Sequence, residues 1–475
     1  MNAFVPIALF GWVPACLALF AFLPKHRAVI AAFLIAWLFL PVVHEPVLGI
    51  KWTKMRATCY GILLAAVIYD GPRLFALRPK ASDIPVLVWC TCPFPSSIVN
   101  GLGPYDGFSQ SLEQTISWGM PYLIGRVYLN SPTELKELCL AMIGSGIVYA
   151  PLCFVETQMS PQMHTWVYGY FPHSFAQTIR FGGYRPVVFM EHGLAVGSWM
   201  TTATLLAFWL WWVRSMQKVT VRKKTVPMLW VFVLMAVITV LCKSSGAIGL
   251  GVIGAAVLLS ARYIPLPVPP MVLLLVLIFP AYVYGRGWGG WTGMELGEAM
   301  GNSFDKERAA SFIFRLDNEN LLLARAKQSP LLGWGGWGRN RVFDIDGKDI
   351  TVTDGLWIIA FGERGVYGLI AMTGTLLVPA IRILVRFPAR VWAAPAFGPA
   401  AALAVSLVLY AVDGLLNAMI NPVFMLIAGG LNSLTLAQVE SAGRRSVGDG
   451  AAAVPKPVSA PRRARIKYPV GIGAA

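Results

Sequence analysis

The stretch GLWIIAFGERGVYGLIAMTGTLLVPA, residues 355–380, is an apolar run long enough to cross a bilayer as a helix, which takes about 20 residues. A second such run, VPPMVLLLVLIFPAYVYG, occupies residues 268–285. Between them, residues 286–354 are polar and aromatic, with nine Lys or Arg and ten Asp or Glu. A loop that keeps so many charges of both signs is more typical of a folded site than of a linker.

The composition of the whole chain indicates a membrane protein. Of 475 residues, 56% are hydrophobic and only 13% are charged, which is too apolar for a soluble domain of this length. We predict an all-α polytopic integral membrane protein with about 12–13 transmembrane helices and one large periplasmic loop. The candidate spans are the apolar runs at 3–23, 28–43, 57–70, 84–103, 107–125, 137–155, 187–213, 227–242, 246–261, 268–285, 355–380, 392–412 and 418–437.

The basic residues predict the orientation. If the basic tail after Val439 is cytoplasmic, the positive-inside rule places most short basic loops on the same side and the large loop outside the cytoplasm. The tail is rich in Ala, Pro and Arg, a composition typical of disorder. We therefore divide the chain into an N-terminal transmembrane bundle (1–285), the large periplasmic loop (286–354), C-terminal transmembrane helices (355–437) and a basic, disordered cytoplasmic tail (438–475).

A short loop at residues 179–186, IRFGGYRP, carries the first group of candidate site residues. We expect Arg180 and Arg185 at the membrane surface, with Glu191 and His192 one to two helical turns below them inside a span. Ionisable residues inside a span are expensive and functional by default. The alternative is that Glu191 pairs with an arginine only to hold the loop.

A helical pattern of apolar residues from 307 to 327 carries the second group. Arg308 and Arg315, seven residues apart, project from one face of this predicted helix. Two guanidinium groups beside a membrane suit a diphosphate, because arginine presents a planar, permanently charged donor fork. The alternative is a simple i, i+4 ion pair between Arg315 and Glu319.

Two further polar segments interrupt or adjoin apolar runs. Residues 242–246, CKSSG, hold the cation Lys243 and form either part of a site or a tight turn between two helices. Asp344 and Asp346 could bind a metal, but an Asp-Gly turn flanked by apolar residues favours a short hairpin. Asp354 lies where the loop re-enters the bilayer, either as a site residue or as a cap for the following helix.

The order of these features resembles the bacterial O-antigen ligase and O-antigen polymerase superfamily. The residues that carry the resemblance are Arg185 in the short loop, Arg315 and PLLGWGGWG (330–338) in the large loop, and ERGVYGL (363–369) in the next span. The likeness covers roughly residues 180–369. At the re-entry position the family has His-Asn and this chain has Asp354-Gly355, which points to an exopolysaccharide polymerase-like member.

The resemblance implies metal-independent, inverting glycosyl transfer on the periplasmic face of the bacterial inner membrane. The donor would be an undecaprenyl-diphosphate-linked oligosaccharide and the acceptor a glycan of a surface polysaccharide, such as lipopolysaccharide O-antigen or exopolysaccharide. No metal, no other cofactor and no nucleic acid is expected, and membrane lipids surround the protein. A flippase or other transporter of lipid-linked glycans is the alternative, although we find no internal repeat of the kind transporters show.

These inferences give a set of candidate site residues. Asp354, Glu191 and His192 are the candidate catalytic residues. Trp334 and Trp337 offer flat faces to sugar rings, although tryptophan is also common at membrane interfaces. The candidate substrate-binding residues are Arg180, Arg185, Lys243, Arg308, Arg315, Trp334 and Trp337.

Overall fold

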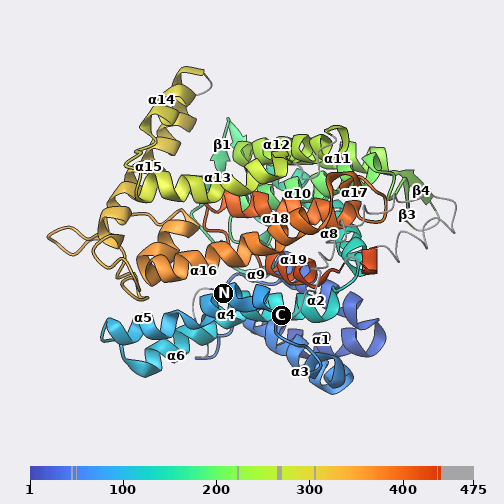
Figure 1. Ribbon diagram of the computed structural model, residues 1–475, viewed down its shortest axis with the longest axis horizontal. Helices are drawn as coiled ribbons and strands as arrows, with labels where there is room; N and C mark the ends of the chain where they lie inside the picture. The colour runs from blue at the N-terminus through green and yellow to red at the C-terminus, as the bar shows by residue number, and fades with distance from the viewer. Residues whose placement is uncertain are drawn as a thin grey trace, which may run out of the picture.

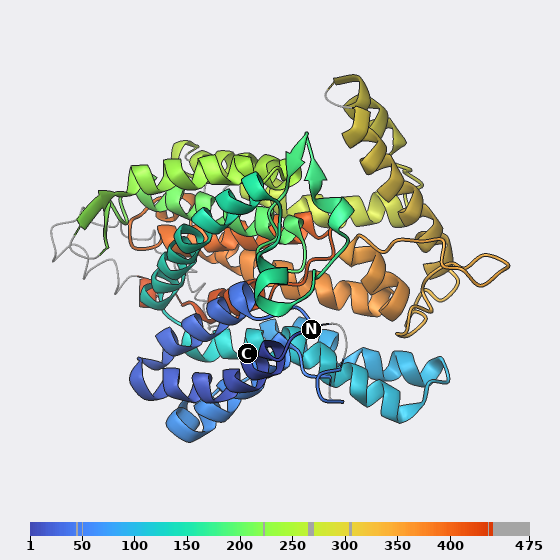
Figure 2. The same ribbon diagram turned by 180° about the vertical axis from the view of Figure 1, so that it is seen from behind.

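The computed structural model is almost entirely helical (Figures 1 and 2). It describes residues 1–43, 46–49, 51–221, 224–264, 270–303, 306–435 and 437–439. The predicted cytoplasmic tail therefore lies almost wholly outside the described residues. The helices are α1 (Phe4–Phe22), α2 (Lys25–Phe39), α3 (Lys54–Phe75), α4 (Ile84–Thr91), α5 (Pro93–Val99), α6 (Gly103–Gln114), α7 (Met120–Tyr128), α8 (Pro132–Met159), α9 (Met163–Tyr168), α10 (Gly193–Trp212), α11 (Met228–Leu241), α12 (Ser245–Tyr263), α13 (Pro270–Gly287), α14 (Met294–Ser303), α15 (Lys306–Ala326), α16 (Leu356–Arg386), α17 (Ala389–Trp392), α18 (Gly398–Asp413) and α19 (Pro422–Ser433).

Short helical turns and two small hairpins complete the described elements. The turns are η1 (Ala81–Asp83), η2 (Thr115–Gly119) and η3 (Phe175–Thr178), and the antiparallel strands are β1 (Ile179–Arg180) with β2 (Gly183–Tyr184), and β3 (Lys218–Val221) with β4 (Lys224–Pro227). Both views show α14 and α15 extending away from the body of the protein, while the β3–β4 hairpin lies at the opposite end (Figures 1 and 2).

Local sequence signals set several helix boundaries. α8 begins with a capping box, in which the Ser131 side chain accepts from Glu134 N–H and the Glu134 side chain accepts from Ser131 N–H, with Pro132 at the first helical position. α19 begins in the same way, with the Asn421 side chain as N-cap and a proline after it. These side chains satisfy backbone N–H groups that have no partner within the helix.

Six described helices are long and apolar enough to cross a membrane: α1, α8, α10, α12, α13 and α16. Three shorter apolar helices, α11, α18 and α19, accompany them. The architecture is therefore that of an all-α membrane protein. The count of 12–13 spans stays a prediction.

The apolar runs predicted several helix limits correctly and others incorrectly. The apolar run 84–103, which prolines interrupt after Cys92, forms two helices, α4 and α5, and the runs 227–242 and 246–261 form α11 and α12. α15 matches the helix predicted from 307 to 327. The run 187–213, however, is helical only from Gly193, because residues 186–192 form an extended segment and a turn. Glu191 therefore does not lie inside a helical span.

The tightest helix crossing joins α7 to α19. Gly125 faces the backbone of Leu426, and Gly429 faces the backbone of Tyr122, so closely that a Cβ on either glycine would collide with a carbonyl oxygen. Small residues let two helices approach until their backbones touch, which favours packing within a membrane. This crossing ties the N-terminal half of the chain to its last described helix.

Replacing Gly429 by alanine should destabilise the protein by about 1–3 kcal/mol, because the added methyl group has no space beside Tyr122. Gly144→Ala on α8 is the matched control, since no heavy atom lies within 4 Å of its Cβ position. Thermal unfolding of the two purified variants in detergent measures the difference. Equal unfolding midpoints would show that the α7–α19 crossing is looser than described.

Candidate functional site

The first wall of the candidate site is the β1–β2 hairpin, which carries Arg180 and leads directly into Arg185. Arg180 pairs with Gly183 across the two strands. Phe181 and Gly182 form the turn, with φ of 50° and 65°. Positive φ at both central residues is typical of the type I′ turn, whose twist matches that of a hairpin. The hairpin therefore holds both arginines on one short element.

The turn between α11 and α12 locks this hairpin in place through Lys243. The Lys243 ammonium group donates to Arg180 O at 3.1 Å, and Arg185 Nη2 donates to Lys243 O at 3.2 Å. A Cβ on Gly183 would displace the Lys243 ammonium group from its present position. Lys243 itself has φ of 52° and does not line the cavity described below. Its position is that of a clamp and not of a ligand-binding residue.

The N-terminus of α12 forms a second wall. Residues 244–247 line the cavity, and the first N–H bonded within the helix is that of Ile248, which donates to Ser244 O at 3.0 Å. No side chain caps this helix end. Free N–H groups and the helix dipole make a helix N-terminus favourable for an anion.

α15 supplies the third wall through Arg315. Its Nη1 donates to Asn417 Oδ1 at 2.9 Å and to Leu416 O at 3.2 Å, and its Nε lies 3.5 Å from the Asp354 carboxylate. Asn417 in turn donates from Nδ2 to Asp413 Oδ1 at 2.8 Å. Arg315 is thus positioned by two segments of the chain: residues 416–417 bind its Nη1, and Asp354 lies beside its Nε.

These walls enclose a cavity of about 620 Å³, which we call the arginine cavity because Arg180, Arg185 and Arg315 all line it. Asp413 is the only acidic residue that lines it within the described part of the chain. The remaining lining is largely apolar and includes Phe181, Leu194, Ala247, Leu250, Leu296, Phe312, Val412 and Leu416. A cavity with three cations and an apolar remainder suits an anion that carries a hydrocarbon group.

The guanidinium groups are desolvated but stay charged. Arg185 is only 8% exposed, and burial together with neighbouring Arg180 and Arg315 lowers its pKa to about 10. That value still leaves it protonated at pH 7. The Nε atoms of Arg180 and Arg185 are buried without a hydrogen-bond partner among the described residues. A bound polyanion would supply both the missing acceptors and the missing negative charge.

Asp354 lies beside the arginine cavity, in a small neighbouring recess that shares Arg315 and Leu416. Its side chain is 37% exposed. The N-cap of α16 is Gly355, which has no side chain to cap the helix, and Leu356 N–H donates to Gly414 O at 2.7 Å. The cap alternative for Asp354 therefore has no support in this geometry.

The structure corrects the placement of Glu191 and His192. Glu191 is exposed, and neither residue lines the arginine cavity. His192 is the N-cap of α10: its Nδ1 accepts from Leu194 N–H at 3.0 Å, and its Nε2 donates to Gln177 Oε1 at 2.9 Å. Burial, His173 and the nearby arginines lower its pKa to about 3, so the imidazole is neutral and both nitrogens are used. A structural role accounts for His192.

Glu319 does not pair with Arg315, which overturns the ion-pair alternative for that arginine. The Glu319 carboxylate lies 2.9 Å from Arg286 Nη2 and accepts from Tyr282 OH at 2.8 Å and from the Trp357 indole. This buried network joins α13, α15 and α16. It anchors α15, so Arg315 is free to face the cavity.

The predicted sugar-binding tryptophans lie elsewhere. The Trp334 indole donates to Arg325 O at 2.8 Å and stacks under the Arg325 guanidinium, 3.5 Å from the ring centroid. Trp337 is 80% exposed and donates to Asp106 at 2.6 Å. Neither lines the arginine cavity.

The glycine-rich segment around them has a structural role. α16 is broken at Gly365, which has φ of 63°, and the chain from Pro330 to Gly335 fills the break. Trp334 N–H donates to Gly362 O at 2.8 Å, and Val366 N–H donates to Pro330 O at 2.8 Å. This pairing explains why the two glycine-rich motifs occur together in the sequence.

Two other predictions concern the large loop. The turn predicted at Asp344 is present: its carboxylate accepts from Asp346 N–H at 3.0 Å and from Lys348 N–H at 2.9 Å. Within the described ranges, no three His, Cys, Asp or Glu residues form a group that could hold a metal ion. The side chain of Arg308 lies outside the described residues.

Sequence reasoning missed Asp413 and Asn417. Both lie between the last two predicted spans, where Asp413-Gly414 ends one apolar run and Asn417 precedes the next. An acidic residue at the edge of a span is a signal for a functional site. It was overlooked because the segment is short and has no basic neighbour in sequence.

The fold and the site define an all-α membrane protein with a cationic, partly apolar cavity at one end of its helices. No protein-family model matches the sequence, and no curated protein matches it either.

Farnesyl diphosphate, an anion that carries a hydrocarbon group, is the probe for the arginine cavity, and we predict that it binds there. Arg185→Ala should weaken this binding about 10- to 150-fold, because a hydrogen bond to a charged group contributes about 1.5–3 kcal/mol. Arg185→Lys should recover only part of the affinity, since lysine cannot bind bidentately. Isothermal titration calorimetry of the purified protein gives the dissociation constants. Arg262→Ala, at the other end of α12, is the matched control. Unchanged affinity in Arg185→Ala would remove the arginine cavity as an anion site.

Proposed function

We propose that the arginine cavity binds the diphosphate of an undecaprenyl-diphosphate-linked glycan and that the protein transfers this glycan to an acceptor sugar. The reaction would belong to O-antigen or exopolysaccharide synthesis at a bacterial inner membrane. The observation that carries the proposal is the meeting of three arginines and an uncapped helix N-terminus in one cavity with an otherwise apolar lining. The diphosphate matches the cations, and the lipid matches the apolar lining.

The chemistry follows from the leaving group. An acceptor hydroxyl oxygen attacks the anomeric carbon of the donor sugar, and the bond from that carbon to the diphosphate oxygen breaks. The electron pair of the broken bond stays on the lipid diphosphate, where negative charge develops. Preorganised donors aimed at developing charge are commonly the largest contribution to catalysis. Attack from the face opposite the diphosphate inverts the anomeric configuration.

Asp354 is the proposed acceptor of the hydroxyl proton. Its carboxylate is exposed enough for a hydrophilic acceptor to reach, and it lies 3.5 Å from Arg315 Nε. If the diphosphate competes for Arg315, the Asp354 carboxylate is released from that ion pair and can accept the hydroxyl proton. Asp413 acts as a positioning residue in this proposal, because it fixes Asn417, which in turn holds Arg315.

The proposed reaction needs no divalent ion. Metal ions in related chemistry stabilise charge on a leaving phosphate, and three guanidinium groups supply positive charge at the same place here. The second candidate function, transport of a lipid-linked glycan, is favoured by one observation: α16 is a broken helix, and broken helices form the sites of many transporters. The break, however, is filled by the chain from Pro330 to Gly335.

Purified protein given an undecaprenyl-diphosphate oligosaccharide and an acceptor glycan should form a longer glycan. A ladder of products indicates a polymerase, a single addition indicates a ligase, and no product with intact donor binding favours the transporter. Chelator should leave the rate unchanged. Asp354→Asn should lower the rate about 10²- to 10⁴-fold, the usual contribution of a general base, while diphosphate binding is kept.

Asp344→Asn is the matched control, since Asp344 forms a turn of the same loop. Asp413→Asn should lower both the affinity for diphosphate and the rate, because its effect passes through Arg315. If instead Asp413→Asn loses only the rate and Asp354→Asn keeps it, the two carboxylates have been assigned in the wrong order.

The proposal also requires the large loop to face the periplasm. In a variant without the seven native cysteines, Ile345→Cys in the large loop and Lys218→Cys on β3 provide two exposed reporters. An impermeant thiol reagent should label only the first in intact cells and both after permeabilisation. If the reagent labels only Lys218→Cys in intact cells, the large loop faces the cytoplasm and the proposed topology is wrong.

A further inference from the structure

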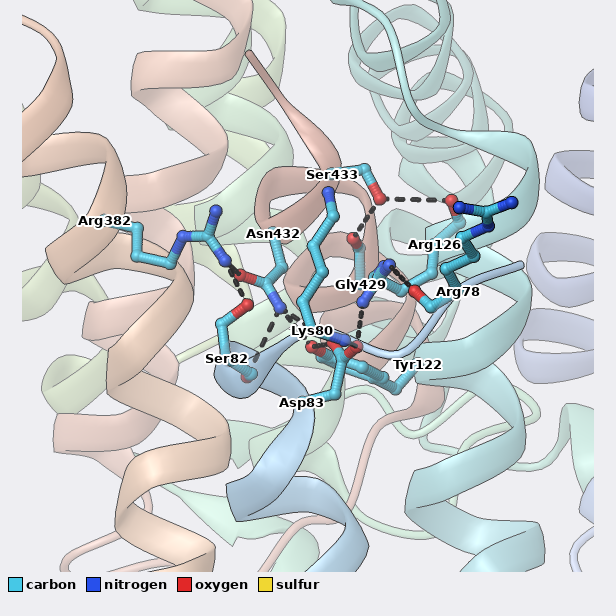
Figure 3. A network of polar contacts seen from close by, with 10 residues as sticks. All are labelled: Arg78, Lys80, Ser82, Asp83, Tyr122, Arg126, Arg382, Gly429, Asn432 and Ser433. Carbon is cyan, nitrogen blue, oxygen red and sulfur yellow. Dashed lines mark hydrogen bonds and ion pairs between the residues drawn. The ribbon is translucent and has the colours of Figure 1, made fainter. Parts of the chain in front are cut away.

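A second polar network, which shares no residue with the arginine cavity, is centred on Asp83 (Figure 3). The Asp83 carboxylate accepts from Lys80 N–H at 2.8 Å, from Tyr122 OH at 2.7 Å and from the Arg126 guanidinium. Asn432 Nδ2 also donates to Asp83, at 3.0 Å. Although burial opposes it, the hydrogen bonds from Arg126 and Tyr122 lower the pKa of Asp83, so this carboxylate is ionised. The network joins η1, α7 and α19.

Positive charge exceeds negative charge around this carboxylate. Lys80, Arg126, Arg382 and Arg386 lie close enough to interact electrostatically, and Asp83 is their acidic neighbour. We call these four cations the basic cluster. Desolvation and the three arginines lower the pKa of Lys80, which reflects their mutual repulsion. One carboxylate cannot neutralise four cations, so the cluster carries a net charge of about +3.

The side chains of the basic cluster keep free donors. Arg382 Nη1 donates to Asn432 Oδ1 at 2.7 Å and to the Ser82 hydroxyl, while its other two nitrogens donate no hydrogen bond to any described residue. Lys80 and Arg386 are exposed. In Figure 3 the Lys80 side chain extends away from the Asp83 carboxylate, while the Arg382 guanidinium points toward Ser82 and Asn432. An external anion can therefore reach them.

The basic cluster borders an apolar surface. Arg382 lies near the C-terminal end of α16, 17 residues after the break at Gly365, which at about 1.5 Å per residue is roughly 25 Å along the helix. Exposed apolar side chains lie close to these cations in sequence. They are Ile84 and Leu87 on α4, and Ile381 and Val385 on α16. Exposed apolar side chains beside cations, at the far end of a membrane-length helix, match a lipid headgroup region and the acyl chains below it.

We propose that the basic cluster binds the phosphate of an anionic phospholipid, whose acyl chains lie over the exposed apolar side chains of α4 and α16. A phospholipid satisfies both halves of this surface at once, which a free anion cannot do. The bound phosphate would relieve the repulsion among the four cations and tie α16 to η1. This site is independent of the proposed glycosyl transfer.

Binding of phosphatidylglycerol to the purified full chain, measured by native mass spectrometry, tests the proposal. Phosphatidylcholine with the same acyl chains is the neutral comparison. Each cation near a lipid surface contributes about a fivefold change in affinity, so Lys80→Gln combined with Arg386→Gln should weaken phosphatidylglycerol binding about 30-fold. Neither side chain makes a hydrogen bond to a described residue, and the Lys80 N–H bond to Asp83 is kept. Arg386→Gln alone, with a fivefold loss, serves as the second variant.

Lys218→Gln combined with Lys224→Gln is the matched control, because it removes the same charge from exposed positions on the β3–β4 hairpin. It should bind phosphatidylglycerol as the wild type does. If both double variants lose the same affinity for phosphatidylglycerol, the effect comes from the overall charge of the protein and not from a specific site, and the proposal is overturned. Equal binding of the two lipids, or displacement of phosphatidylglycerol by an equal concentration of inorganic phosphate, would overturn it as well.

Discussion

Every backbone N–H and C=O at membrane depth must find its partner inside the protein, because hydrocarbon offers none. This constraint bears hardest on α16, which loses its regular hydrogen bonds at Gly365. The chain from Pro330 to Gly335 restores them: besides the two bonds described above, Gly335 N–H donates to Glu363 O at 3.0 Å and Tyr367 N–H donates to Leu331 O at 3.2 Å. The break in the helix and the fold of the large loop are therefore one structural unit.

The candidate site depends on one buried ion pair. Arg286 and Glu319 hold α15 against α13 and α16. Removing one member of such a pair leaves an uncompensated buried charge, which destabilises the protein. Because this ion pair fixes α15 against α13 and α16, the position of Arg315 in the arginine cavity is set by tertiary contacts and not by its neighbours in sequence. A cationic site built this way is preorganised before any ligand arrives.

Much of the fold could be predicted from sequence because apolar runs and prolines act locally. The end of α4 at Cys92, the two helices α11 and α12, and the helix α15 all followed from such patterns. The start of α10 did not, because residues 187–190 are apolar without being helical. Their burial comes from contacts with α8, where Glu156 accepts from the N–H groups of Val187 and Val188.

Site residues were predictable only where charge was conspicuous. Arg185 and Arg315 were both candidate substrate-binding residues because of their charge beside spans, and both line the arginine cavity. The roles of His192 and Trp334 depend on contacts with Leu194, Gln177 and Arg325, which no periodicity reveals. Asp413 lies in a short segment with no basic neighbour in sequence, and its partner Asn417 is uncharged, so neither residue was conspicuous. Tertiary contacts, and not residue type, decide such roles.

The pairing of residues 330–335 with α16 has a consequence for how this segment can change. Surface loops ordinarily tolerate insertions and deletions. Here the loss of one residue would shift the register of four backbone hydrogen bonds and drive a Cβ into Glu363 or Leu331, where Gly333 and Gly365 now fit. The exposed Leu331 side chain makes no such demand. Over evolutionary time the segment can vary in composition, but its length is fixed.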